Sequence, residues 1–201
     1  MVQSLIAQEV SFDLRRGLES AAVLLPIPAD PEMLAACLAF IVERLRNLLL
    51  ETGYHYDVVD AVIVVQGSNP ARTSQSVKQL SVWVKRPDWH TILPSYARCV
   101  RITRDLTQSY NLDPQGFIEK AEKSLYTALI QTEEAMRQRH ENSPDSFLTA
   151  FLPMIPAVNN FFDQVLVMAE VANLRQNRLA LLQRIVALGL GIADMSKLEG
   201  F

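Results

Sequence analysis

The sequence predicts an all-α protein, and three observations support this fold class. An Asp or Ser precedes a Pro at Asp30-Pro31, Asp113-Pro114 and Ser143-Pro144. Such pairs are typical of helix starts, because the first side chain accepts a backbone N–H and proline lacks an N–H at a position that needs none. Apolar residues between these pairs recur at helical spacing. Only residues 57–65 favour a strand, and a lone strand would leave its backbone groups unpaired.

The first long helix is expected over residues 31–52, with Gly53 as a left-handed stop. Its apolar face consists of Leu34, Leu38, Ile41, Leu45 and Leu48. Residues 57–65 are valine-rich and favour a strand by propensity, but we expect a helix because Asp57 can cap it and Asp60 suits its first turn.

The segment 67–72 contains Gly, Ser, Asn and Pro and is the expected hinge. It divides the chain into an N-terminal helical layer, residues 1–66, and a helical bundle, residues 73–201. The layer is either the end of an upstream domain or part of the bundle.

Within the bundle, helices are expected from residue 114 to about residue 140 and from residue 144 onward. Pro153 and Pro156 separate the latter from an aromatic helix over residues 161–168, and Gly189 and Gly191 end a last helix that contains residues 175–182. The aromatic helix is expected to bury one apolar face, made of Phe161, Phe162, Val165, Met168 and Ala169.

Charge and composition exclude several classes of protein. A net charge of -3 argues against a nucleic-acid binder that uses its whole surface, so any such binding needs a local patch. Residues 85–104 provide one, with five basic residues and one acidic residue. Cys37 and Cys99 predict neither a disulfide framework nor a zinc site. No run is long enough to span a membrane and no signal peptide is evident, so a cytoplasmic protein is expected.

No catalytic residue and no metal site is predicted. His55, His90 and His140 are far apart in the sequence and lack partners at ligand spacing. No Gly-x-Ser-x-Gly elbow or glycine-rich phosphate loop occurs. A degenerate hydrolase remnant is the weakest of the functions considered.

Arg98, Arg101 and Arg104 recur every third residue and therefore share one broad side of a helix, with Trp89 and Tyr96 nearby in the sequence. Guanidinium groups bind phosphates and aromatic faces stack on unpaired bases, so an RNA-binding surface is predicted; an ordinary solvated face is the alternative. On a helical wheel Arg178 falls inside an apolar arc, which predicts a structural pair with a carboxylate such as Asp163 or Asp194. Arg175 falls at the edge of that arc and is expected to be free to meet RNA.

Five segments carry a family resemblance: Phe161 to Met168, Arg175 to Leu182, Ala193 to Leu198, Phe40 to Arg46, and Asp57 to Val62. In this order they resemble the C-terminal region of the bacterial glycyl-tRNA synthetase β subunit. The resemblance implies a helical bundle like the class I-type (DALR-like) anticodon-binding domains. Because it begins in the middle of the subunit, further β-subunit domains are expected upstream.

The resemblance also implies a function. This chain would bind glycine tRNA through Arg98, Arg101, Arg104, Arg175 and Asn177, while the α subunit, with ATP and Mg²⁺, would perform the ligation. The expected partners are the tRNA, the α subunit and the upstream β-subunit domains, with neither a membrane nor DNA. The alternative is a helical protein-interaction module that docks on the α subunit or other β-subunit domains without touching RNA.

Overall fold

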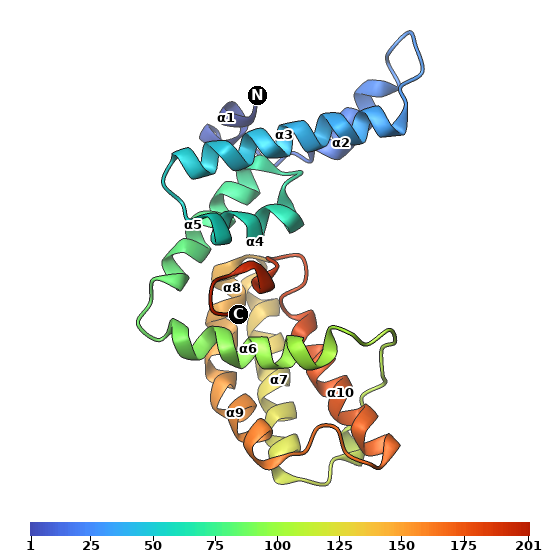
Figure 1. Ribbon diagram of the computed structural model, residues 1–201, viewed down its shortest axis with the longest axis vertical. Helices are drawn as coiled ribbons and strands as arrows, with labels where there is room; N and C mark the ends of the chain where they lie inside the picture. The colour runs from blue at the N-terminus through green and yellow to red at the C-terminus, as the bar shows by residue number, and fades with distance from the viewer. The chain divides into compact units, whose positions relative to one another are not determined.

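The computed structural model describes residues 1–201 and contains α-helices and short 3₁₀ turns but no β-strand, which confirms the all-α prediction (Figure 1). The chain forms two compact units. The first consists of Met1–Lys85 and Gly191–Glu199, and the second of Arg86–Leu190 and Gly200–Phe201. The second unit contains the arginine-bearing helix and therefore positions the candidate site.

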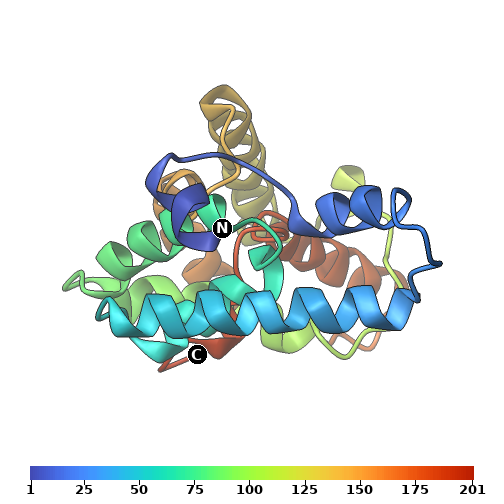
Figure 2. The same ribbon diagram turned by 90° about the horizontal axis from the view of Figure 1, so that it is seen from above.

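The first unit begins with five helices: α1 (Val2–Ala7), α2 (Leu14–Ala22), α3 (Pro31–Glu51), α4 (Tyr56–Gln66) and α5 (Pro70–Val84). Helix α3 confirms the prediction for residues 31–52: the Asp30 carboxylate accepts the N–H of Glu32, and Gly53 adopts a left-handed φ of +93°. Helices α2 and α3 lie side by side, joined by residues 23–30 (Figure 2).

Helix α4 confirms that the valine-rich segment is helical. Val58, Val59, Ala61 and Val62 are completely buried or nearly so, and the helix packs on α3 and α5. Arg46 of α3 joins it through a bidentate salt bridge to Asp60, with N–O distances of 2.6 and 3.0 Å. Asp57 is not the cap residue, because the N-cap is His55, two residues earlier, and Asp57 lies in the first turn.

The C-terminal segment Gly191–Glu199 completes the first unit by covering α4. It includes the short 3₁₀ turn η3 (Met195–Lys197), which Asp194 caps through the N–H of Ser196. The N–H of Asp194 donates to the carbonyl of Ala61, and Gln66 Nε2 donates to the carbonyl of Ile192. These bonds pair backbone groups that burial would otherwise leave unsatisfied.

The second unit contains the remaining elements: α6 (Trp89–Thr103), η1 (Pro114–Gly116), α7 (Lys120–Arg139), α8 (Pro144–Phe151), η2 (Leu152–Met154), α9 (Ile155–Gln164) and α10 (Ala172–Ala187). Helix α6 packs on α10, and α7 packs on α8 and α9. Tyr96 joins α6 to the end of α10, since its hydroxyl donates to the carbonyl of Val186. The hydroxyl lies so close to Gly189 that a side chain at that position would clash with it.

Two helix predictions are wrong in part. The start predicted at Asp113-Pro114 is only a 3₁₀ turn, and α7 begins at Lys120 with a capping box formed by Glu119 and Glu122. The aromatic helix ends at Gln164, and Val165 already has extended backbone angles. The β-branched side chain of Val165 suits this extended conformation. Val167 and Met168 then form a turn, and tertiary contacts described below hold the segment in place.

The expected hinge at residues 67–72 lies inside the first unit, between two helices that pack on each other. The Thr73 hydroxyl donates to the carbonyl of Gln66, and the Ser76 hydroxyl donates to the Gln66 side chain. The chain instead passes between its units near residues 85–86, and α5 belongs with the layer that precedes it.

Candidate nucleic-acid interface

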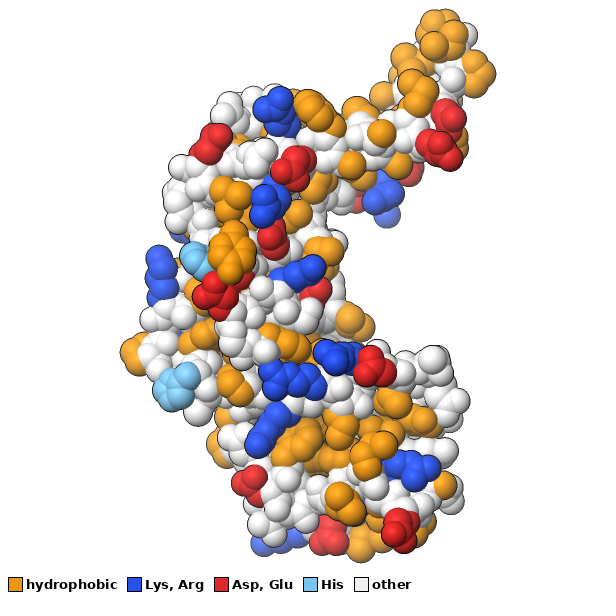
Figure 3. All heavy atoms as spheres, viewed as in Figure 1, with side chains coloured by type: hydrophobic (Ala, Val, Ile, Leu, Met, Phe, Trp, Pro, Cys, Tyr) orange, Lys and Arg blue, Asp and Glu red, His pale blue; other side chains and the backbone are white.

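Helix α6 separates buried residues from charged ones. Ile92, Tyr96 and Cys99 are buried, whereas Arg98, Arg101 and Arg104 are exposed, as their spacing predicts. Burial raises the pKa of the Cys99 thiol to about 12, so this cysteine is a core residue without reactivity. Figure 3 shows basic side chains gathered over α6 and hydrophobic side chains beside them on the same unit.

The three exposed arginines differ in their surroundings. The guanidinium of Arg98 lies 5.6 Å from the ring centroid of Phe162, and that of Arg101 lies 5.3 Å from the ring centroid of Phe201. Arg104 is 3.6 Å from the carboxylate of Asp105, and both side chains are exposed. None of the three is locked into a buried salt bridge, so their charges can meet an anion from solution.

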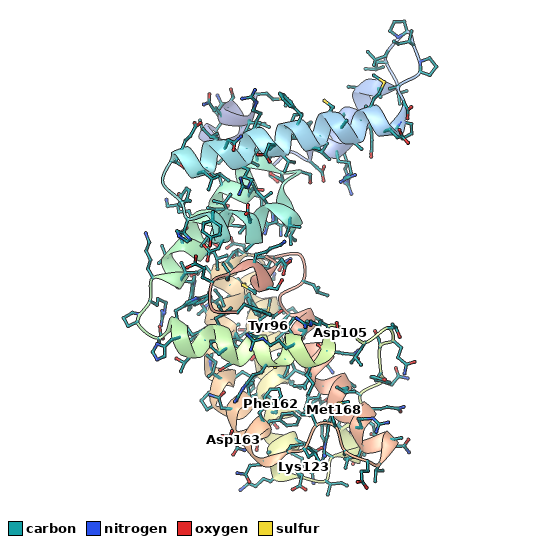
Figure 4. All side chains as sticks on the ribbon, viewed as in Figure 1. Tyr96, Asp105, Lys123, Phe162, Asp163 and Met168 are labelled. Carbon is teal, nitrogen blue, oxygen red and sulfur yellow. The ribbon has the colours of Figure 1, made fainter.

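The irregular segment between α9 and α10 exposes two apolar side chains. Val165, Val167 and Ala169 are buried, whereas Leu166 and Met168 are 72% and 57% exposed. Buried and exposed side chains therefore alternate along this irregular segment, in which Val167 and Met168 form a turn. The prediction that Met168 and Phe162 lie in the core is therefore wrong for Met168, and Phe162 is only half-buried (Figure 4).

Two arginines of α10 bind backbone carbonyls of this segment. Arg175 Nη1 donates to the carbonyl of Ala169 at 3.0 Å, and Arg178 Nη1 donates to the carbonyl of Leu166 at 2.8 Å. Arg175 is half-buried by this arrangement. Its Nη1 thus positions the segment between α9 and α10. Its contact with RNA stays a prediction.

Arg178 is buried, as the helical wheel predicts, but its partner is neither Asp163 nor Asp194. Its Nε lies 2.6 Å from the Glu122 carboxylate, and the Glu122 side chain has no exposed surface. The other Glu122 oxygen accepts the N–H groups of Ile118 and Glu119. Asp163 is exposed (Figure 4), and Asp194 caps η3 in the first unit.

Asn177 also makes structural contacts. It is 7% exposed, and its amide makes a reciprocal pair of bonds with the backbone of Asp113: Nδ2 donates to the carbonyl and Oδ1 accepts the N–H, each at 2.8 Å. Both of these hydrogen bonds join the Asn177 side chain to the backbone just before η1. Of the five predicted RNA contacts, the structure brings together the three on α6 and assigns structural contacts to Arg175 and Asn177.

Three potential metal ligands meet in the first unit, where the ligand atoms of His55, Asp57 and Glu199 lie within 4.8 Å of one another. Asp57 already uses both oxygens: one accepts the N–H of Val58 and lies 2.6 Å from His55 Nδ1, and the other accepts the N–H of Glu199. The cluster also lies at the N-terminus of α4, where the helix dipole disfavours a cation. These residues fasten the C-terminal segment to α4. Sequence spacing could not reveal them, because Asp57 and Glu199 are 142 residues apart.

No helix combines the length and the apolar character needed to cross a bilayer. An all-α unit with an exposed row of arginines and apolar groups beside it defines a class of helical nucleic-acid-binding module. Residues 92–199 match the family described as the DALR anticodon binding domain, which covers more than half of the chain. The chain belongs to this family.

Similar curated proteins include glycine–tRNA ligases. The β subunit from Moorella thermoacetica is 36% identical over 166 residues, which is 79% of this chain and 23% of that protein. The β subunit from Sulfurihydrogenibium sp. is 30% identical over the whole chain and 28% of its own length. The chloroplastic/mitochondrial glycine–tRNA ligase 2 of Arabidopsis thaliana is 30% identical over the whole chain and 19% of its own length. The chain thus spans only 19–28% of the length of these relatives.

Proposed function

We propose that this chain binds the anticodon region of glycine tRNA as the anticodon-binding part of a glycine–tRNA ligase β subunit. The single observation that carries the proposal is the exposed row of Arg98, Arg101 and Arg104 within the matched family domain. Glycine–tRNA ligases among the relatives support the choice of tRNA.

The mechanism divides binding into two steps. The arginines attract and hold phosphates, because the guanidinium group matches a phosphate in two parallel hydrogen bonds. Bases that are splayed out of the anticodon loop are then read on their edges. Glycine codons begin with two guanines, so the anticodon presents two cytosines, whose acceptor atoms suit arginine donors.

Ligation is assigned in this proposal to other parts of the enzyme. ATP and Mg²⁺ would be bound by the α subunit, since this chain has neither a glycine-rich phosphate loop nor a nucleophile paired with a base. The chain would contribute affinity and identity for the tRNA, in a cytoplasmic enzyme assembled with the α subunit and the remaining β-subunit domains.

A double variant tests the arginine row. We expect Arg98→Gln with Arg101→Gln to weaken binding of glycine tRNA and to lower the slope of log affinity against log salt by about one per lost phosphate contact. Gel-shift or fluorescence titrations at several salt concentrations measure both quantities. Arg15→Gln with Arg16→Gln is the matched control, because it removes the same charge from exposed positions of α2. Equal affinity and slope in the α6 variant and the control would contradict the proposal.

A tRNA with an altered anticodon separates recognition from general electrostatic attraction. We expect the unmodified chain to bind glycine tRNA more tightly than the same tRNA with its two anticodon cytosines replaced. Equal affinities for the two tRNAs would contradict anticodon recognition and would show that the chain binds RNA non-specifically.

A second function, docking on protein, is favoured by a separate observation in the first unit. The loop between α2 and α3 exposes large apolar side chains: Val23 is 84% exposed, Leu24 85%, and Ile27 68%. We call Val23 to Ile27 the hairpin tip. Beside it, a groove of about 340 Å³ is lined mainly by apolar residues of α2 and α3, including Leu18, Leu34 and Leu38. An exposed apolar patch next to an unfilled groove is typical of a protein interface. The occupant we propose is the remaining part of the longer β subunit.

A further inference from the structure

The surface beside the α6 arginines contains apolar groups that electrostatic binding does not need. Leu166 and Met168 are 72% and 57% exposed, and the half-buried Phe162 lies under the guanidinium of Arg98. Phe162 and Met168 lie on the face of the second unit seen in Figure 4. We call Phe162 and Met168 the apolar platform.

The platform is held rigidly, although its outer side chains face water. Val165, Val167 and Ala169 anchor the segment in the core, and Arg175 and Arg178 bind the carbonyls of Ala169 and Leu166. A surface that is ordered before its ligand arrives loses less conformational entropy on binding. Exposure of Leu166 and Met168 is therefore built into the fold and does not result from a loose loop.

The charges around the platform select its occupant. Arg98, Arg101 and Arg104 would repel a basic partner and attract a phosphate chain. A guanidinium over an aromatic ring presents a flat, cationic stacking surface, and thioether and aliphatic groups beside it suit the apolar face of a base. A purely apolar protein helix would fill the platform but would leave the arginines without partners.

We infer that the apolar platform stacks against one unpaired base of the bound RNA, while the arginines of α6 hold the flanking phosphates. This inference rests on the proposed tRNA binding and specifies how one nucleotide is bound. Stacking does not require a particular base, so the platform would provide affinity and position the neighbouring nucleotides for reading on their edges.

The test uses the whole chain and the anticodon stem-loop of glycine tRNA. We expect Met168→Ser and Phe162→Leu each to lower the affinity by about tenfold, as loss of one stacked base does. Their salt slopes should stay unchanged, because no phosphate contact is lost. Leu190→Ser is the control: this exposed leucine lies just after the C-terminal end of α10, and its variant should bind like the parent.

Stem-loops with one abasic nucleotide identify the base. At one loop position, removal of the base should weaken binding to the parent chain. The same removal should lower the affinity of the Met168→Ser variant little further, since both changes delete the same contact. The inference would be contradicted if the platform variants bound RNA with the affinity of the parent chain. It would also be contradicted if, at every loop position, the losses of affinity from the abasic nucleotide and from Met168→Ser were fully additive. Retained RNA affinity with lost binding to the rest of the β subunit would assign the platform to protein instead.

The two proposals fail in different ways. If the parent chain binds the stem-loop and the Arg98 and Arg101 variant does not, but the platform variants bind normally, only the platform is wrong. If the parent chain does not bind glycine tRNA, both proposals are wrong.

Discussion

Arg178 and Glu122 form a salt bridge whose side chains are 6% and 0% exposed, and each also binds backbone groups. The helical wheel predicted that Arg178 would be buried, because its neighbours on α10 are leucines. The wheel could not identify Glu122, which is 56 residues away and belongs to a helix start that the sequence placed six residues too early. At the scale of single residues, burial could therefore be predicted, but partners could not.

Removal of the Arg178 side chain tests this pair. We expect Arg178→Ala to lower the free energy of unfolding by about 3–5 kcal/mol, because a buried carboxylate loses its partner. Arg98→Ala, at an exposed position, should change it by less than about 1 kcal/mol. Urea denaturation of the three proteins measures the difference. A variant with Arg178→Met and Glu122→Gln should regain part of the stability, and equal midpoints for Arg178→Ala and the parent would show that the pair contributes nothing.

Among the helices and segments, local signals identified α3, α4 and α8, whose starts carry cap residues or acidic first turns. The same reasoning failed for residues 165–168. Their apolar run continues the pattern of α9, but the chain leaves the helix at Val165, and Arg175 and Arg178 bind the carbonyls of Ala169 and Leu166. The sequence thus predicts one part of the candidate site, the arginine row, from the spacing of its residues. It does not predict the platform, which depends on contacts between residues that are distant in the sequence.

The attachment of the C-terminal segment to α4 should depend on pH. A hydrogen bond that the His55 ring donates to the Asp57 carboxylate raises the pKa of His55, so the fold favours the charged imidazole. This contribution is complete below the pKa of His55 in the unfolded chain, about 6.5, and is lost as the pH rises through the higher folded value. Burial raises the pKa of Asp57, but bonds from the Glu199 N–H and His55 outweigh it and lower the pKa overall. The stability that the charged Asp57 contributes is present above the pKa of an ordinary carboxyl group. It is lost as the pH falls through the lower pKa of Asp57 in the folded protein.

We therefore expect the stability of the first unit to fall as the pH rises from about 6 to about 8, and this slope to flatten in His55→Asn. Hydrogen exchange of the Glu199 amide, which binds Asp57, reports the local effect. His140→Asn removes a histidine from the second unit and should keep the parent slope. A parent protein whose Glu199 amide has the same protection factor at both pH values would contradict the linkage.

For the whole molecule, the net charge of -3 conceals an uneven surface, with a basic row on α6 and a hairpin tip that is apolar. Exposed apolar side chains in such density promote self-association. We expect Leu24→Asn with Ile27→Asn to reduce association of the purified chain in light scattering without lowering its melting temperature. The same variant should bind the remainder of a β subunit, supplied as a separate polypeptide, more weakly than the parent. Val82→Asn, at an exposed site on α5, is the control.

The return of residues 191–199 to the first unit has a consequence for biosynthesis. The backbone of Ala61 and the side chains of Asp57 and Gln66 are satisfied by residues that leave the ribosome more than a hundred positions later. Contacts of such long sequence separation form slowly, and a nascent chain with α4 uncovered exposes its valines in the meantime. The unit that begins at Met1 can therefore be completed only after residues 191–199 have been synthesised. Until then, chaperones would have a long opportunity to bind at α4.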